Sequence, residues 1–408
     1  MHSIFCVLLS LHILFYSTLS FIPCISTRIL FSEAVPSTEE SSSVQESSPA
    51  ISISASSAVL MEASTGAILY EKDSHTTRNP ASITKIMTLI LIFEAIENKK
   101  ISLTDVVTVS EHAASMGGSQ VYLEVGETQT VETMIKCISI ASANDASVAM
   151  AEYVSGSEES FVMEMNAKAQ ELGMKDTKFV NCCGLDTKGH QTSAYDVALM
   201  ARELSVKHPQ IHEYCTIWMD TITHTTAKGS SEFGLTNTNK LIRQYPYATG
   251  LKTGFTNEAK FCLAATGEKD GMKMISVVMG AESSAARSTD ASALLEYGFA
   301  KCQIYTDENQ DNLPQIDIKK GVKDSLPLAY KNSFQYLSVD GMDFAQIEKK
   351  INLPETMDAP VKNGDKVGEA VYLIGGKKLG AVDIVAAADV AKAVFADYLL
   401  EVLRGYFR

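Results

Sequence analysis

The strongest constraint in this sequence is the segment of residues 79–87, which reads NPASITKIM. Pro80 has a fixed φ and lacks a backbone N–H, and both properties suit the first turn of a helix. The apolar residues that follow predict a buried helix. Ser82 and Lys85 then share one helix face, because residues i and i+3 are neighbours there. A lysine removed from water loses its proton more easily, so the pair predicts a serine hydroxyl activated by a neutral amine.

Two further motifs follow in a set order. Ser142-Ala143-Asn144 comes next, and Lys252-Thr253-Gly254 comes after it. Each motif alone is weak: an S-x-x-K pair occurs on many surface helices, and Ser142 with Asn144 would more often cap a helix. The order S-x-x-K, S-x-N, K-T-G is that of the penicillin-binding proteins and serine β-lactamases. The series therefore favours a catalytic interpretation.

Composition excludes other classes of function. The chain has 408 residues, 46% hydrophobic content and a net charge of −14, and it has no cluster of Lys and Arg, which argues against nucleic-acid binding. The eight cysteines fit neither a disulfide framework nor a zinc ribbon. No H-E-x-x-H motif is present, so a zinc peptidase is disfavoured. Four histidines are expected in surface or loop positions: His190, His208, His212 and His224.

The N-terminus predicts export. Residues 4–22 are almost wholly apolar, and a small-x-small site ends at Ala34, so residues 1–34 are interpreted as a signal peptide. An uncleaved membrane anchor is the alternative, since about 20 apolar residues span a bilayer. Residues 35–56, rich in Ser, Glu and Pro, are expected to form a disordered linker.

Residues 57–302 predict one α+β domain. Apolar runs at 58–61 and 67–70 flank a turn and predict a hairpin, and runs at 261–266 and 272–279 are joined through Asp270-Gly271. Helices are expected at 134–141 and 146–153, with Ser142 and Asn144 in the break, and at 197–206 after a capping arrangement over residues 193–196. A helix at 291–299 would cover the sheet.

The remainder of the chain predicts two more segments. Short alternating runs with turns indicate a small β-rich domain over residues 303–386. Residues 387–408 predict an amphipathic helix with apolar and charged stripes. Docking on a membrane surface is one interpretation of this helix. Packing on the β domain or on a second subunit is the other, because the helix's charges sum to zero.

With these residues in place, the chain from about residue 57 resembles the low-molecular-weight penicillin-binding proteins, the serine D-alanyl-D-alanine carboxypeptidases of the cell wall. The resemblance implies a penicillin-binding and serine β-lactamase-like transpeptidase fold: an antiparallel sheet with a helical subdomain, a C-terminal β domain and a terminal helix. Beyond the three motifs it rests on further matches: Glu62-Ala63-Ser64-Thr65-Gly66, Met165-Asn166, Gly184-Leu185, Asn237-x-Asn239 and Gly250-Leu251.

The resemblance also implies a mechanism and a location. Ser82 would attack the carbonyl between the two terminal D-alanines of a peptidoglycan stem peptide, neutral Lys85 would take its proton, and Ser142 would relay a proton to the leaving amine. Water would then release the shortened peptide at the outer face of the cell membrane or in the wall. No metal or cofactor is needed, and β-lactam antibiotics are expected as covalent inhibitors.

The remaining matched residues would bind substrate. Asn144 would hold the peptide amide, while Lys252 and Thr253, with Arg287 helping, would hold the terminal carboxylate, because cations meet a carboxylate well. Gly254 would permit close approach of substrate, and the backbone N–H of Phe255 would form the oxyanion hole with that of Ser82. Two residues depart from the family pattern: Lys260 stands where glycine is usual, and Cys183 precedes Gly184 where His or another residue is common.

Two other functions compete with this interpretation. A class A β-lactamase uses a glutamate-held water for deacylation, and no glutamate lies between Glu171 and Glu203. Penicillin is therefore expected to acylate Ser82 and to leave slowly. A catalytically inactive wall-binding scaffold is the second alternative, and the presence of every motif side chain argues against it.

Overall fold

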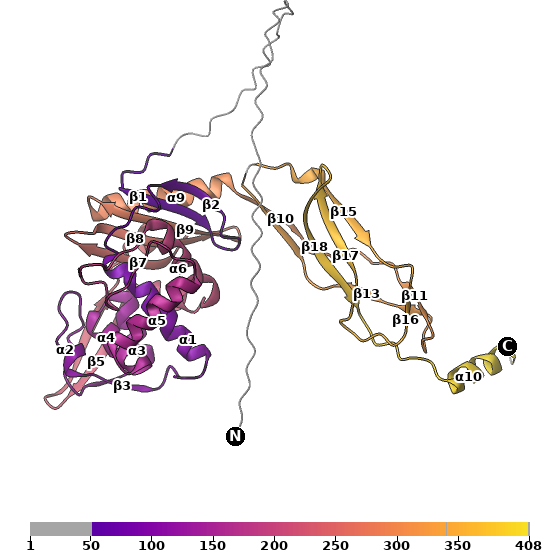
Figure 1. Cartoon of the computed structure of the whole chain (residues 1–408), viewed down its shortest axis with the longest axis horizontal. Helices are drawn as coiled ribbons and strands as arrows, with labels where there is room; N and C mark the ends of the chain where they lie inside the picture. The colour runs from indigo at the N-terminus through magenta and orange to yellow at the C-terminus, as the bar shows by residue number, and fades with distance from the viewer. Residues whose placement is uncertain (1–50, 340, 407–408) are drawn as a thin grey trace, which may run out of the picture. The chain divides into compact units, whose positions relative to one another are not determined.

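The computed structural model describes residues 51–339 and 341–406 (Figure 1). The predicted signal peptide 1–34 and residues 35–50 of the predicted linker lie outside the described residues. The disorder predicted for residues 51–56 is wrong. Ile53 and Ala55 are buried, and the Asp290 carboxylate accepts hydrogen bonds from Ser54 Oγ and Ala55 N, each at 2.8 Å. These contacts fix a stretch whose composition is that of a linker.

The centre of the catalytic region is a five-stranded antiparallel sheet in the order β2-β1-β9-β8-β7. The predicted hairpins are confirmed, and the β8–β9 turn contains Asp270 and Gly271. β7 lies at the edge of the sheet and carries the K-T-G motif in its middle. The strands are β1 (Ser57–Glu62), β2 (Ile68–Lys72), β7 (Ala248–Thr256), β8 (Lys260–Lys269) and β9 (Met272–Ala281).

Each face of this sheet is buried in its own core, because successive side chains of a strand point to opposite faces. Val59 and Val277 pack with the helical region that contains α1 and α6, whereas Leu60 and Val278 pack with α9. Figure 1 shows α9 (Ser284–Lys301) on one side of the sheet and the group of helices that includes α1 and α6 on the opposite side. α9 is longer than the predicted 291–299.

The helical region is organised around α1, which is apolar on all sides and therefore buried. The predicted helices are confirmed, with one shift: Asn144 is the first residue of α4 and does not lie in the break before it. The remaining elements here are η1 (Ala81–Thr84), α1 (Lys85–Glu97), β3 (Val106–Thr108), α2 (Glu111–Ala114), β4 (Thr128–Thr130), α3 (Val131–Ile140), α4 (Asn144–Ser155), α5 (Glu158–Glu171), α6 (Ala194–Lys207), α7 (Ile211–Cys215), β5 (Met219–Thr226), β6 (Gly229–Thr236) and α8 (Leu241–Gln244).

The C-terminal region is β-rich, as predicted. Its strands form sheets in the orders β13-β18-β17-β15, β12-β11-β16 and β10-β14, with Phe334 stacked on Tyr372 in one of its cores. The elements are β10 (Gln303–Asp307), β11 (Ile316–Lys319), β12 (Ser325–Leu326), β13 (Leu328–Tyr330), β14 (Phe334–Ser338), η2 (Phe344–Gln346), β15 (Ile347–Asn352), β16 (Thr356–Asp358), β17 (Lys366–Ile374) and β18 (Lys377–Ala386).

The last helix is shorter than predicted. α10 spans Phe395–Tyr406, whereas residues 387–394 are not helical. Val390 explains the difference: it is 1% exposed, packs in a β-domain core and exchanges two backbone hydrogen bonds with Val361. In the described part of the chain, no helix has the length and apolar content needed to cross a membrane.

Candidate active site

Ser82 lies in the tight 3-10 turn that leads into α1. Pro80 precedes this turn with a φ of −75°, and Ala81 adopts a left-handed φ of 48°. Side chains at i and i+3 are eclipsed in a 3-10 turn. Ser82 Oγ is accordingly 3.1 Å from Lys85 Nζ, and this confirms the predicted proximity of the two side chains.

Lys85 is fully buried, and its amine lies among three oxygen atoms. Nζ is 2.6 Å from Asn144 Oδ1, 2.6 Å from the Cys183 carbonyl oxygen and 3.1 Å from Ser82 Oγ. Burial lowers the pKa of Lys85 to about 8, although Cys183, Cys182 and Asp145 oppose the shift. A substantial fraction of the amine is therefore neutral near physiological pH.

The three contacts also orient this neutral amine. It has two N–H donors and one lone pair, and both Asn144 Oδ1 and the Cys183 carbonyl can only accept. The two short bonds therefore use both N–H groups. The lone pair is left for the third neighbour, the hydroxyl of Ser82, which donates into it. This arrangement is what a general base for a serine nucleophile requires.

The S-x-N motif lies where α3 ends and α4 begins. Ser142 adopts a left-handed φ of 62° between the two helices, and it is 3% exposed. Asn144 donates from Nδ2 to the Gly117 carbonyl at 2.7 Å and from its backbone N to the Ser119 carbonyl at 2.7 Å. These bonds leave Oδ1 to face Lys85.

The K-T-G lysine reaches the S-x-N serine. Lys252 Nζ donates to Ser142 Oγ at 2.8 Å and to the Thr253 carbonyl at 3.0 Å, and the side chain is 1% exposed. The pKa of Lys252 is well below its ordinary value because of burial and the positive charges of Lys85 and Arg287. An anionic ligand beside Lys252 would offset that repulsion and restore its charge.

The hydrogen bonds thus form two groups. One joins Ser82, Lys85 and Asn144, and the other joins Ser142 and Lys252. The junction of α3 and α4, which carries Ser142 and Asn144, connects them, and the two lysines lie close enough to lower the pKa of Lys252. All three predicted motifs therefore meet in one place.

Two glycines permit the close packing around Ser82. A Cβ at Gly254 would lie 3.0 Å from the Pro80 carbonyl oxygen, so β7 runs directly against the Ser82 turn. A Cβ at Gly184 would lie 1.9 Å from the Ala81 carbonyl oxygen and 3.0 Å from Ser82 N, and Gly184 has a φ of +91°. The loop that holds the Cys183 carbonyl can therefore reach Lys85 only with glycine beside it.

The remaining predicted residues surround this centre. Thr253 Oγ1 hydrogen-bonds with Thr238 Oγ1 at 2.7 Å. Phe255 is 50% exposed, and its ring packs on Phe261. Arg287 is 7% exposed, and Nη1 donates to the carbonyl oxygen atoms of Gly254 at 3.3 Å and of Cys262 at 3.4 Å. Its guanidinium therefore contacts the backbone of β7 and β8.

Sequence reasoning missed three participants. The Cys183 carbonyl carries no residue-type signal, whereas Thr238 stands between the two asparagines of the N-x-N match. Asp145 accepts backbone hydrogen bonds from Val121 and Leu123 and so anchors the loop that contacts Asn144. The surface or loop prediction is wrong for His224, which is 8% exposed and lies in β5. His190 and His208 do lie outside helices and strands, but they are buried, at 2% and 4% exposed.

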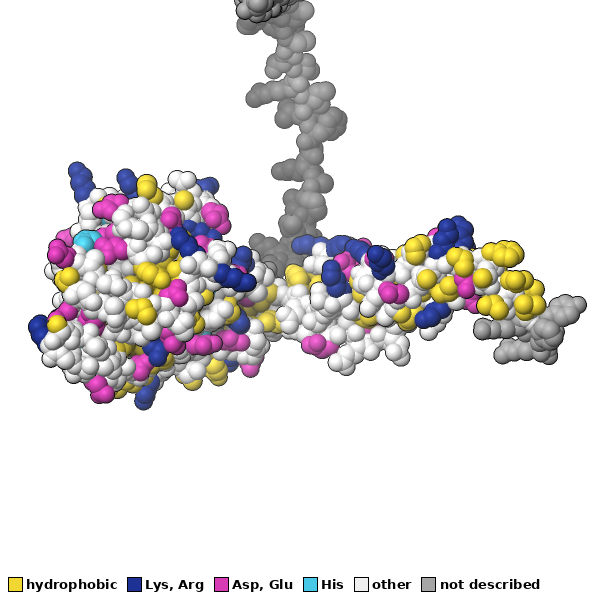
Figure 2. All heavy atoms as spheres, turned by 90° about the horizontal axis from the view of Figure 1, so that it is seen from below, with side chains coloured by type: hydrophobic (Ala, Val, Ile, Leu, Met, Phe, Trp, Pro, Cys, Tyr) yellow, Lys and Arg dark blue, Asp and Glu magenta, His cyan; other side chains and the backbone are white. Residues whose placement is uncertain are grey.

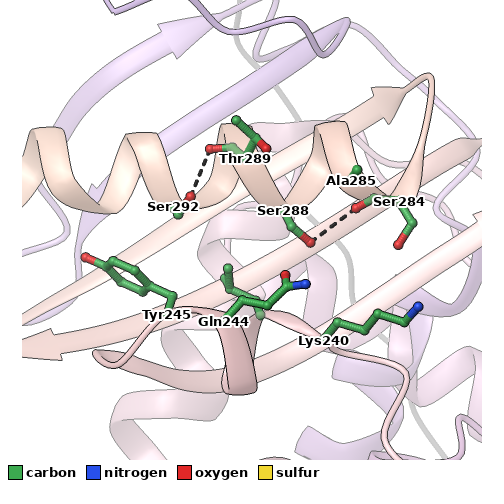
Figure 3. A pocket seen from close by; sticks show the side chains of 9 residues that line it. Lys240, Gln244, Tyr245, Ser284, Ala285, Ser288, Thr289 and Ser292 are labelled. Carbon is green, nitrogen blue, oxygen red and sulfur yellow. Dashed lines mark hydrogen bonds between the residues drawn. The ribbon is translucent and has the colours of Figure 1, made fainter.

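A separate cavity of about 580 Å³ lies between α8 and α9 and contains none of the candidate residues (Figure 3). Figure 3 shows Lys240, Gln244 and Tyr245 facing a row of small hydroxyl side chains on α9. Within residues 51–339 and 341–406, no group of three His, Cys, Asp or Glu side chains is arranged to hold a metal ion.

Comparisons with known proteins agree with this geometry. A family model described as D-alanyl-D-alanine carboxypeptidase matches residues 42–283, and a model of the C-terminal domain of penicillin-binding protein 5 matches residues 306–392. D-alanyl-D-alanine carboxypeptidase DacF of Bacillus subtilis (strain 168) is 43% identical over 346 residues, which cover 85% of this chain and 88% of DacF.

Two solved structures extend the comparison. PBP3 from Streptococcus pneumoniae, described as a peptidoglycan synthesis regulatory factor, is 29% identical with a TM-score of 0.68 and covers 83% of this chain and 100% of its own. Penicillin-binding protein D2 from Listeria monocytogenes, solved in its ampicillin-bound form, is 31% identical with a TM-score of 0.54 and covers 62% of this chain and 100% of its own.

Gly184→Ala is expected to impair both folding and labelling by a fluorescent penicillin, because the new Cβ would displace the backbone of Ala81 and Ser82. Gly189→Ala is the matched control: its φ of +85° imposes a strain of about 1–2 kcal/mol, but the site is open. Thermal unfolding and the labelling rate of the folded fraction measure the two effects. Labelling of folded Gly184→Ala at the Gly189→Ala rate would contradict the proposed packing.

Proposed function

This chain belongs to the D-alanyl-D-alanine carboxypeptidase family, and we propose that it removes the terminal D-alanine of peptidoglycan stem pentapeptides through an acyl-enzyme on Ser82. The observation that carries this assignment is the buried amine of Lys85. Two obligate acceptors take its N–H groups, and its lone pair faces the Ser82 hydroxyl. A nucleophile and its base are thereby fixed before substrate arrives.

Acylation then proceeds by balanced proton transfers. Lys85 takes the Ser82 proton as Oγ forms a bond to the carbonyl carbon between the two D-alanines. The backbone N–H groups of Ser82 and Phe255 are the proposed donors to the developing oxyanion. Ser142 gives its proton to the leaving amine as the C–N bond breaks, and Lys252, at 2.8 Å, resupplies it. Free D-alanine departs, and the peptide remains esterified to Ser82.

Substrate recognition is proposed to use the positive charges of Lys252 and Arg287. A carboxypeptidase must bind a free carboxylate, and the buried ammonium of Lys252 with the Thr253 hydroxyl is the proposed partner. Arg287 donates a hydrogen bond to the Gly254 carbonyl of β7 and adds positive charge near Lys252. Asn144 is proposed to hold a substrate amide while its Oδ1 orients Lys85.

After acylation Lys85 carries the Ser82 proton and Lys252 has given one up, so a proton passes from Lys85 to Lys252 and makes the Lys85 amine neutral again. For deacylation, Lys85 then takes a proton from the attacking water and gives it to Ser82 Oγ as the ester C–O bond breaks. Penicillin is expected to form an ester with the same serine, and this protein is a penicillin-binding enzyme like its relatives. The chain offers no glutamate between residues 171 and 203 that could activate water as in class A β-lactamases. The relatives' names likewise favour a carboxypeptidase over a β-lactamase or an inactive scaffold.

We propose further that the enzyme acts at the outer surface of the cell membrane, through α10. Its exposed apolar side chains include Phe395 at 81%, Leu399 at 49% and Val402 at 67%. Figure 2 shows hydrophobic side chains gathered where the described chain ends. Such an amphipathic helix suits the lipid interface. Vesicle binding by the full chain that survives the double substitution Leu399→Asp and Val402→Asp would contradict this role.

The main test is mass spectrometry of a synthetic stem pentapeptide incubated with the protein. The expected product is the tetrapeptide plus one alanine, and Ser82→Ala is expected to release none, because no acyl-enzyme can form. A stable penicillin adduct on Ser82, with little nitrocefin hydrolysis, is expected alongside. Folded wild-type protein that leaves the pentapeptide intact would contradict the assignment, and rapid nitrocefin turnover would favour the β-lactamase alternative.

A further inference from the structure

His190 is a buried histidine that makes two hydrogen bonds in a fixed direction. The backbone N–H of Val180 donates to Nδ1 at 2.9 Å, so the ring hydrogen lies on Nε2. Nε2 in turn is 2.8 Å from Thr84 Oγ1 and donates to it. Burial lowers the pKa of His190 to about 4, so the imidazole stays neutral at working pH. The ring is therefore a permanent one-donor, one-acceptor bridge.

One end of this bridge lies inside the S-x-x-K motif. Thr84 is the last residue of the 3-10 turn, it is fully buried, and its side chain makes no capping bond to α1. It stands between Ser82 and Lys85, where the turn changes into the α-helix. The angle between the two catalytic side chains depends on that change of geometry. The hydroxyl of Thr84 is thus fixed at this junction by a group from another segment.

The other end closes the loop that supplies the Cys183 carbonyl. His190 and Val180 join the base of this loop, and Asn181 Oδ1 accepts from Gly184 N at 2.6 Å nearer its tip. Just beyond His190, Thr192 exchanges two backbone hydrogen bonds with Arg78, directly before the S-x-x-K segment. One short stretch of chain therefore holds the Ser82 turn from both sides.

We propose that His190 is a positioning residue for acylation: it ties the Ser82–Lys85 junction to the loop whose Cys183 carbonyl orients the Lys85 amine. The inference rests on the proposed roles of Ser82 and Lys85. Without the imidazole, the junction and the loop separate, and water replaces the carbonyl beside Nζ. The lone pair of Lys85 then loses its fixed direction, and a misplacement of about 1 Å costs up to roughly a hundredfold in rate.

The test compares variants of the full chain by the maximal rate of acylation with a fluorescent penicillin, measured from pH 6 to 10. His190→Leu removes both hydrogen bonds, His190→Gln retains one donor and one acceptor, and Thr84→Val removes the same bond from the opposite side. His208→Leu is the matched control, since His208 is also buried, at 4% exposed, but stacks on Phe93 at the far end of α1. None of these changes alters the charged or titratable groups that act on Lys85, namely Cys182, Cys183, Asp145 and Lys252.

His190→Leu and Thr84→Val are expected to acylate about ten- to a hundredfold more slowly. The pH of half-maximal rate should also rise above the wild-type value near 8, because hydration of Lys85 reverses the burial that lowers its pKa. His190→Gln should recover most of the rate, and His208→Leu should lose stability without any change in rate or midpoint.

Wild-type rate and midpoint in His190→Leu, with a lower melting temperature alone, would overturn the positioning role. If His190→Leu does not fold, Thr84→Val tests the same role, because it removes the same hydrogen bond. Ser82→Ala separates the two proposals: loss of labelling in that variant, together with normal labelling of His190→Leu, refutes only the positioning role. Wild-type protein that is not labelled at Ser82 by the fluorescent penicillin would contradict both the proposed function and the positioning role.

Discussion

The arrangement of this enzyme depends on one buried amine and its three oxygen neighbours. In water, an ammonium group is stable and a serine hydroxyl is a poor nucleophile. Complete burial of Lys85 removes the hydration that favours its charged form. Two short hydrogen bonds to acceptors then orient the neutral amine. The same burial would be costly for an unpartnered polar group. Hydrogen bonds to the Asn144 amide oxygen and the Cys183 carbonyl offset this free-energy cost, and they direct the lone pair of Lys85 toward Ser82.

Four segments that are far apart in the chain must therefore meet within hydrogen-bond distance. The sheet contributes β7 with Lys252, the helical region contributes the Ser82 turn and the S-x-N loop, and the loop at residues 180–190 closes the group. Gly184 and Gly254 allow backbone to approach backbone where any side chain would intervene. Two lysines placed so close repel each other, and a substrate carboxylate relieves that repulsion. Substrate binding and base activation are thus linked electrostatically.

The sequence predicted those parts of the site that depend on residue type and local period. Ser82 and Lys85 follow from i,i+3 geometry, and Ser142 follows from a break between two apolar runs. Main-chain acceptors such as the Cys183 carbonyl cannot be recognised from residue type, since any residue can supply them. The burial of His190 within its loop was not predicted for a related reason: it depends on contacts with Val180 and Thr84, which the sequence around His190 does not reveal. Likewise, the terminal helix begins later than predicted because Val390 hydrogen-bonds with Val361, which its own sequence neighbourhood does not reveal.

The central claim is that burial lowers the pKa of Lys85 to about 8, so that its neutral form is available as a base near physiological pH, and its own titration tests this most directly. Protein labelled with ¹³C in its lysine side chains would be titrated by NMR, with Lys85→Met used to assign the resonance. The predicted midpoint is about pH 8, and the acylation rate should rise through the same midpoint, because the neutral fraction grows as pH rises. A Lys85 midpoint near the ordinary lysine value of 10.5, in a protein that acylates rapidly at pH 7, would contradict the account.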